Sequence, residues 1–149
     1  MEKIAVIKIR SNLKKTGAIQ TVLKNLKLDK LYSCVLLDKS ESNLGMFKVA
    51  ESVLTYGEID KETLKKLLMR RSMLSNKKRY EWKEAELTAF VEDLLAGKKS
   101  LSDIKVKKIF HLHPPIKGFE RNGKKAPYKL KGASGYRGND INGLLQRMI

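Results

Sequence analysis

The chain has 149 residues and a mass of 17.0 kDa, which suits one domain with a small appendage and excludes a large two-lobed enzyme. Its 32 Lys and Arg residues outnumber its 16 Asp and Glu residues, and the net charge of +16 exceeds the magnitude of about 2 to 8 that suits a free small domain. This surplus indicates a polyanionic partner, while the lone Cys34 excludes an internal disulfide and no run of about 18 apolar residues offers a membrane span.

The first 60 residues alternate between β-rich and helical patterns. The expected elements are a strand over 3–9, a helix over 16–26, a strand over 31–37, a helix over 43–54 and a strand over 55–59. Thr16 and Asn43 are the expected N-cap residues of the two helices. Each helix has an apolar face, which we assign to the core. The pattern predicts a β-α-β-α-β unit with its helices on one face of a small sheet, the other face being left for another contact.

The remaining residues are helical and basic. The expected elements are an amphipathic helix over 61–71 capped by Asp60, an aperiodic loop over 72–83, a helix over 84–96 with Gly97 as its C-cap, a strand over 107–112, a Pro, Gly and Lys-rich loop over 114–138 and a helix over 140–148.

The predicted fold class is therefore α+β. It consists of a two-layer, ferredoxin-like β-α-β-α-β core, with a small antiparallel sheet and helices on one face, plus a helical and basic C-terminal extension. We place the core domain at residues 1–59 and the extension at residues 60–149.

Most of the positive charge falls in the extension. Residues 1–60 carry a net charge of +3, whereas residues 61–83 carry +7 and residues 98–137 carry +10. The two basic blocks are therefore the expected contact surface for nucleic acid. Because residues 117–137 have few large apolar side chains, we also expect that segment to be poorly ordered until it binds RNA.

Two motifs near the C-terminus have a functional and a structural interpretation. His111 and His113 would point to the same side of a strand, but no neighbouring Cys, Asp or Glu completes a metal site, so RNA contact or structural hydrogen bonding is favoured. Residues 132–135 fit the GxxG loop with which KH modules clamp a nucleic-acid backbone, and the alternative is an ordinary surface turn. Glycines here would let the backbone approach phosphates and leave Tyr136 and Arg137 free to stack.

Residues 77–82 interleave cations with aromatic rings. Lys77, Lys78 and Arg79 could neutralise phosphates while the rings stack on bases. The alternative is a solvated loop whose Trp82 fills a small core. We expect a mixture, with Trp82 packed inward and the three cations facing outward.

No pattern in the sequence suggests catalysis. The acidic residues do not lie beside His, Ser or Cys in an arrangement for acid–base or nucleophilic chemistry, and phosphate-binding glycine motifs are absent. We therefore expect no enzyme activity, no cofactor, no metal and no small-molecule substrate. The lack of a secretory signal pattern favours the cytoplasm.

Two stretches of the sequence resemble a known family. The first comprises Lys3-Ile-Ala-Val-Ile-Lys-Ile-Arg-Ser11, the apolar and polar pattern from Val22 to Val35, and Gly45-Met46. The second comprises Phe110-His-Leu-His-Pro-Pro115, Lys117-Gly-Phe119, Pro127-Tyr128 and Gly135-Tyr-Arg-Gly138. Together they resemble the large-subunit ribosomal protein family L-thirty in its long archaeal form, the second stretch being the more specific.

The resemblance implies a structural ribosomal protein that binds the large ribosomal RNA, with the 5S RNA and other large-subunit proteins as neighbours and no catalytic residues of its own. The matched positions that would face RNA are Arg10, Ser11, Lys14, Lys15, Lys48, His111, His113, Arg121, Tyr136 and Arg137. Charge alone adds Arg70, Arg71, Lys77, Lys78, Arg79, Lys107, Lys108, Lys117, Lys124, Lys125, Lys129 and Lys131.

Two other classes of protein remain as alternatives. Charge alone does not separate RNA from DNA, so a chromosomal DNA-binding protein is the main rival, although no helix-turn-helix texture is present. A small RNA-processing enzyme is the second rival, and the lack of an acid–base pair argues against it.

Overall fold

A computed structural model of the chain describes residues 3–11, 15–74, 76 and 78–149. Lys14 and Lys77, both expected to contact RNA, lie outside the described residues. The helices and strands are β1 (Lys3–Lys8), α1 (Gly17–Asn25), β2 (Ser33–Asp38), α2 (Glu41–Val49), β3 (Leu54–Glu58), α3 (Lys61–Arg71), α4 (Glu84–Leu95), β4 (Ile109–His111), β5 (Gly135–Tyr136) and α5 (Ile141–Met148), with 3₁₀ turns η1 (Tyr128–Leu130) and η2 (Gly138–Asp140).

The strands form a mixed sheet in the order β4-β2-β1-β3-β5. The central strand β1 pairs antiparallel with β2 and with β3, β4 joins β2 antiparallel, and β5 joins β3 in parallel. Both outer strands thus come from the C-terminal extension, so the core and the extension share one sheet. The β-α-β-α-β unit and the α+β class that the sequence predicts are confirmed.

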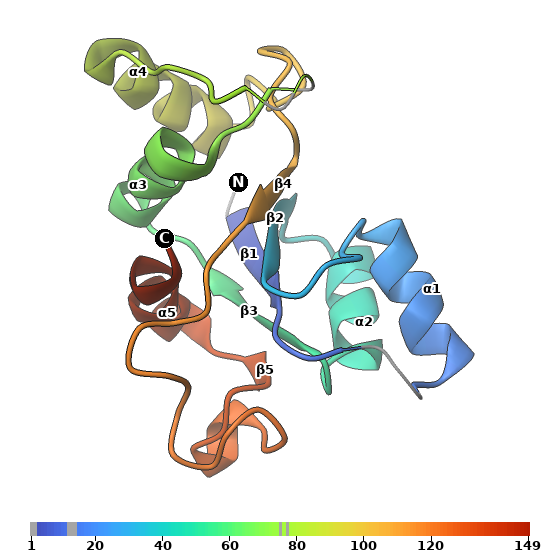
Figure 1. Cartoon of the computed structure of the whole chain (residues 1–149). Coiled ribbons are helices and arrows are strands. Elements are labelled where there is room, and N and C mark those ends of the chain that lie inside the picture. The colour runs from blue at the N-terminus through green and yellow to red at the C-terminus, as the bar shows by residue number, and fades with distance from the viewer. Residues whose placement is uncertain (1–2, 12–14, 75, 77) are drawn as a thin grey trace.

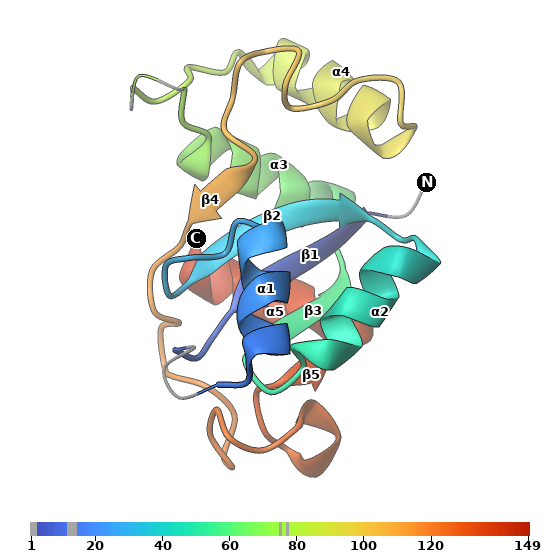
Figure 2. The same ribbon diagram turned by 90° about the vertical axis from the view of Figure 1, so that its right-hand side faces the viewer.

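The sheet is covered on both faces, which explains the continuous apolar run in β1. Ile4 and Val6 lie in a core cluster under α1 and α2, whereas Ala5 and Ile7 lie in a second cluster under α3 and α5. Figure 1 shows α1 and α2 on one side of the sheet and α3 and α5 on the other, and Figure 2 shows the same layers in depth. The face that we expected to be free is therefore closed by the chain's own extension.

The extension contributes its own apolar residues to the second cluster. Leu64, Leu67 and Leu68 of the basic helix α3 are fully buried there, as the helical spacing predicts. Helix α4 packs against α3 on the side away from the sheet, as Figure 1 shows, and buries Leu87 and Phe90. The apolar residues of the acidic helix α4 and of the basic helix α3 thus belong to one cluster.

Several local boundaries differ from the predictions. The N-cap of α2 is Ser40, whose Oγ accepts a hydrogen bond from the backbone N–H of Asn43, so the prediction of Asn43 as the cap was wrong. Neither Thr16 nor Asp60 uses its side chain to cap its helix, although both stand at the N-cap position. Strand β4 is shorter than predicted, and His113 lies beyond its end.

Candidate nucleic-acid interface

Residues 114–140, which we call the tail, are held against the sheet by the buried side chain of Arg137. Its side chain is 1% exposed. Its Nε donates to Thr55 Oγ1 at 2.8 Å, its two terminal nitrogens donate to the two carboxylate oxygens of Glu120 at 2.6 Å each, and one of them also donates to the Ala133 carbonyl. The guanidinium also lies over the Tyr128 ring at 4.6 Å. The expectation that this guanidinium is free to stack on RNA was wrong, because its donors are satisfied inside the protein.

The pKa of Glu120 is affected by its contact with Arg137. Burial alone would raise the pKa of Glu120, but the hydrogen bond and charge of Arg137, together with Arg147, outweigh it and hold that pKa below its ordinary value. The pair is therefore ionised at neutral pH and forms a bidentate, charge-assisted contact.

The glycine motif 132–135 also has a structural role. All four of its residues are buried, and a Cβ at Gly132 would lie 2.0 Å from the Ala126 carbonyl oxygen. Gly135 adopts a φ of +88°, and a Cβ there would lie 2.4 Å from the Glu51 carboxylate, so few side chains could occupy this position. At Gly132 and Gly135, protein atoms therefore fill the space that was expected to admit a phosphate.

Hydrogen bonds to β3 continue along the tail. The Thr55 hydroxyl donates to the Gly135 carbonyl at 3.1 Å, and the Arg137 N–H donates to the Tyr56 carbonyl at 2.9 Å. Ala133 and Ser134 are buried. This bonding differs from the expectation of a poorly ordered segment, because a polar network takes the place of the large apolar residues that the tail lacks.

The tail presents exposed cations around this anchored interior. The Lys124 ammonium, half-buried, donates to the Tyr32 hydroxyl at 2.6 Å and lies within 5.0 Å of the ring centroids of Tyr32 and Phe119. The exposed cations among the predicted contacts are Lys117, Arg121, Lys125, Lys129 and Lys131. Lys124 therefore fastens the tail to the β1–β2 side of the core, while its neighbours remain accessible.

Predicted contacts from the core lie at the same end of the molecule as the tail. Arg10 follows β1 and donates to the Ser52 carbonyl at 3.2 Å, Ser11 is exposed and Lys15 is half-buried. Lys48, exposed, comes from α2. Both ribbon views place the C-terminal end of β1 and the tail toward the same end of the sheet (Figures 1 and 2).

A second basic area lies at the opposite end, where residues 72–74, 76 and 78–83 meet residues 106–108; we call it the hairpin region. Backbone bridges join Met73 to Arg79 and Leu74 to Val106. The cations that it presents among the predicted contacts are Lys78, Arg79, Lys107 and Lys108, all exposed. The structure therefore divides the predicted contacts between two ends of the molecule.

Trp82 supports the hairpin region from inside. Its Nε1 donates to Ser72 Oγ at 2.7 Å, and its ring centroid lies 4.6 Å from that of Tyr80 and 5.2 Å from that of Phe90. The prediction that Trp82 packs inward while Lys78 and Arg79 face outward is confirmed.

Several arginines lie at the end of α3 beside the hairpin region. Burial lowers the pKa of Arg71, and the charges of Arg79 and Arg70 lower it further. Arg70 is exposed, whereas Arg71 donates through Nε to the main-chain oxygen of Ile149 at 3.2 Å. The charges of Arg70 and Arg79 near Arg71 favour an anionic partner there.

His111 is the last residue of the edge strand β4, and His113 follows the strand. His111 and His113 are both exposed, and Ser33 Oγ lies 3.4 Å from His111 Nδ1. Burial lowers the pKa of His111, as do the charges of Lys30 and Lys107. Among the described residues, no group of three or more His, Cys, Asp or Glu side chains is placed to hold a metal ion.

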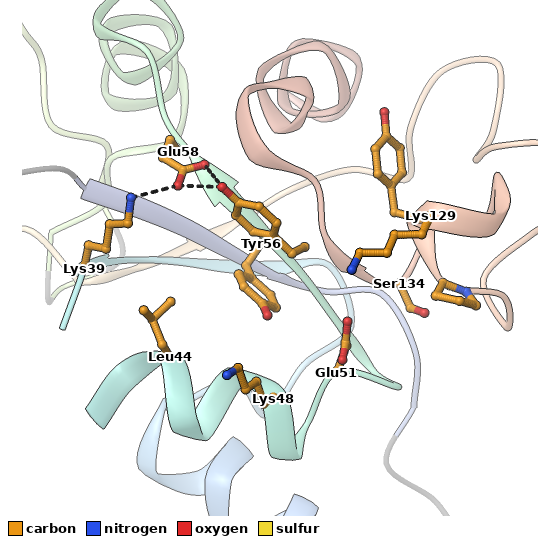
Figure 3. Close-up of a pocket in the computed structure, with 11 residues that line it drawn as sticks. Lys39, Leu44, Lys48, Glu51, Tyr56, Glu58, Lys129 and Ser134 are labelled. Carbon is orange, nitrogen blue, oxygen red and sulfur yellow. Dashed lines mark hydrogen bonds and ion pairs between the residues drawn. The ribbon is translucent and has the colours of Figure 1, made fainter. Parts of the chain in front are cut away.

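A cleft separates the tail from α2 and β3. Its volume is about 540 Å³, and its walls comprise Lys39, Leu44, Lys48, Glu51, Tyr56, Glu58, Pro127, Tyr128, Lys129, Ser134 and Tyr136. Figure 3 shows Leu44 and Lys48 on α2 opposite Lys129 and Ser134 of the tail. Of these residues, Lys48, Lys129 and Tyr136 are predicted contacts.

Other walls of the cleft were missed by sequence reasoning. Tyr56 and Glu58 lie on β3, and Lys39 lies after β2; the Lys39 ammonium lies 3.3 Å from the Glu58 carboxylate. The parallel pairing of β5 with β3 places the tail opposite these side chains and so forms the cleft. This pairing joins residues that are distant in sequence. No local pattern in the sequence signals that pairing.

The fold and surface together define a class: a small basic α+β protein that presents cations from loops at both ends of a covered sheet. Within the described part of the chain, no helix is long and apolar enough to cross a membrane. Comparison with models of known protein families gives no match.

Similarity to individual proteins identifies the family. The chain is 38% identical over 151 residues to "Large ribosomal subunit protein uL30" of Methanococcus vannielii, which covers 97% of this chain and 98% of that protein. It is 34% identical over 155 residues to uL30 of Nanoarchaeum equitans, covering both chains completely, and 39% identical over 143 residues to uL30 of Methanopyrus kandleri, covering 88% and 93%. The chain therefore belongs to the large ribosomal subunit protein uL30 family, and the resemblance found in the sequence is confirmed.

Proposed function

We propose that the protein is a structural constituent of the large ribosomal subunit in the cytoplasm and that it binds and stabilises folded ribosomal RNA without catalysing a reaction. The observation that carries the proposal is the similarity to proteins named uL30 along nearly the whole chain. The net charge of +16 and its concentration in the extension support RNA as the partner.

The proposed RNA contacts form two groups at opposite ends of the molecule and a pair of histidines at the edge of the sheet. The tail end contributes Arg10, Ser11, Lys15, Lys48, Lys117, Arg121, Lys125, Lys129, Lys131 and Tyr136, and the hairpin end contributes Arg70, Lys78, Arg79, Lys107 and Lys108. His111 lies on β4 opposite Ser33, and His113 follows that strand. Arg137 and Lys124 act by holding the tail in place. Two groups at opposite ends suit a protein that bridges two segments of RNA, with the 5S RNA and other large-subunit proteins as proposed neighbours.

The test measures affinity for a large-subunit rRNA transcript over a salt series, with duplex DNA as competitor. About 8 phosphate contacts give a log–log slope near −7 for duplex. Changing Lys107 and Lys108 to Gln, or Lys125 and Lys129 to Gln, should each reduce the slope by about 1.8. The matched control changes Lys24 and Lys27, exposed at the end of α1, and should leave the slope unchanged.

Association with ribosomes provides an independent test. The native protein should sediment with the large subunit in a sucrose gradient at moderate salt. Its absence from that peak, or tighter binding to duplex DNA than to rRNA at one salt concentration, would contradict the proposal and favour a DNA-binding protein. Turnover of labelled rRNA would instead favour an RNA-processing enzyme.

A further inference from the structure

We propose that the cleft between α2, β3 and the tail receives one unstacked nucleotide of the ribosomal RNA, with its base against Tyr136. This inference rests on the proposed function and gives it a defined subsite. The volume of about 540 Å³ lies within the range of roughly 300 to 1,000 Å³ that is typical of small-molecule pockets. A single nucleotide is a ligand of that size.

The aromatic wall is positioned in advance. Tyr136 lines the cleft and is 44% exposed, so a ligand in the cleft can reach its ring. Its hydroxyl donates to the Glu58 carboxylate, with oxygens at 2.8 and 2.9 Å, and its ring centroid lies 5.6 Å from that of Tyr56. Tyr56 in turn packs on Phe47 of the core at 5.0 Å. Since the ring is already held in place, stacking a base on it costs little additional ordering.

Cations enclose the cleft from three separate elements. Lys39 follows β2, Lys48 belongs to α2 and Lys129 belongs to η1 of the tail. Figure 3 shows Lys48 and Lys129 on facing walls. Lysines on opposite walls can neutralise the phosphates on the two sides of one nucleotide, which gives the RNA backbone a path across the opening.

Carboxylates in the interior decide which end of the nucleotide enters. Burial would raise the pKa of Glu58, but hydrogen bonds from Tyr136 and Lys39 outweigh it and hold that pKa below its ordinary value. Glu51 lines the same cleft, and within the described residues its carboxylate forms no hydrogen bond or ion pair. Two negative charges repel a phosphate from the interior, whereas Glu51 can accept from an exocyclic amino group of adenine, guanine or cytosine. The base therefore enters and the phosphates stay at the lysines.

The first experiment uses the full-length protein and a large-subunit rRNA transcript. Tyr136→Leu should weaken binding about tenfold, because the ring is lost while an apolar side chain is retained. The loss should be the same factor at every salt concentration, since stacking releases no counterions. Tyr136→Phe keeps the ring and should bind nearly as the wild type does. Leu130→Ala, an exposed apolar change in the same tail, is the matched control and should have no effect.

A change of Lys129 separates the effect of charge from the effect of stacking. Lys129 lines the cleft together with Tyr136. Lys129→Gln should reduce the salt slope by about 0.7 to 0.9, the value for one phosphate contact. Tyr136→Leu should leave the slope unchanged. A slope change for Tyr136→Leu, or equal affinity of Tyr136→Leu and wild type in circular-dichroism-verified folded samples, would overturn the inference.

Direct evidence comes from ultraviolet crosslinking of the protein–rRNA complex followed by mass spectrometry. We expect a nucleotide attached at Tyr136, and a crosslink map that lacks Tyr136 would contradict the subsite. If free adenosine or guanosine monophosphate bound the wild type as tightly as rRNA does, a soluble nucleotide would replace RNA as the ligand. If the wild type binds rRNA and Tyr136→Leu binds it equally well, only this inference fails. If the wild type does not bind rRNA, the proposed function fails as well.

Discussion

The tail and the hairpin region look alike in sequence but are supported differently. Both are basic, aperiodic and interleaved with aromatic residues. The tail is anchored by a buried guanidinium that contacts Glu120, Thr55 and Ala133. The hairpin region is held by isolated backbone bridges and by the half-buried Trp82. A single buried ion pair can thus turn a loop of small and polar residues into a fixed platform.

The difference has a consequence for binding. Cations on a fixed platform lose little conformational entropy when they meet phosphate, whereas cations on a lightly supported loop lose more. We therefore expect the tail to set the position of the protein on RNA and the hairpin region to add affinity that depends strongly on salt.

Arg137→Leu is the largest expected perturbation. It leaves the partly buried carboxylate of Glu120 without its bidentate partner and removes the contacts of Arg137 to Thr55 and Ala133. Breaking such a pair should lower the free energy of unfolding by about 3 kcal/mol. Urea denaturation followed by circular dichroism measures the change. Amide exchange at Ser134 should accelerate in the same variant.

Arg121→Leu provides the control, because Arg121 is exposed in the same tail. Equal destabilisation by the two changes would contradict the anchoring role of Arg137. Unfolding at low pH provides a second measurement. The pKa of Glu120 is held below 4.5 in the folded state. The contribution of Glu120 to the free energy of unfolding is therefore complete above pH 4.5 and is lost as the pH falls through the lowered pKa. Arg137→Leu should weaken this dependence.

The core of the fold was predictable from local patterns. The apolar run in β1 and the helical spacing of Leu64, Leu67 and Leu68 follow from burial, which acts on side chains near one another in sequence. The second helical layer was not predicted, because an uninterrupted apolar strand is consistent with one covered face or two. The structure shows that successive residues of β1 face different layers. Ile4 faces α1 and α2, whereas Ala5 faces α3 and α5.

The candidate site was predictable in composition but not in arrangement. Charge counting located the basic segments, yet Arg137 and the solvent-facing Arg121 are indistinguishable as sequence letters. Their different roles depend on Glu120 and Thr55, which lie 17 and 82 residues from Arg137. The same limit hid the cleft, whose walls Tyr56 and Tyr136 meet through the pairing of distant strands.

Trp82→Phe is a smaller perturbation that tests the support of the hairpin region. It retains a ring against Phe90 but removes the hydrogen bond from Nε1 to Ser72 Oγ. The free energy of unfolding should fall by about 1 kcal/mol, less than for Arg137→Leu. Urea denaturation followed by circular dichroism measures it. A loss as large as that of Arg137→Leu would show that the hairpin region is supported as strongly as the tail.

His111 provides the smallest effect and reports on charge at the edge strand β4. Because burial and the charges of Lys30 and Lys107 lower its pKa, the folded protein binds fewer protons than the unfolded chain between that lowered pKa and 6.5. The contribution of His111 to stability therefore increases with pH across that window and is constant above it. In an NMR titration, Lys107→Gln should move the pKa of His111 back toward 6.5, whereas Lys24→Gln on α1 should not. Binding of rRNA should raise the same pKa, because phosphates replace the repulsion of the lysines with attraction. If that pKa is identical in free and bound protein, no RNA phosphate approaches His111.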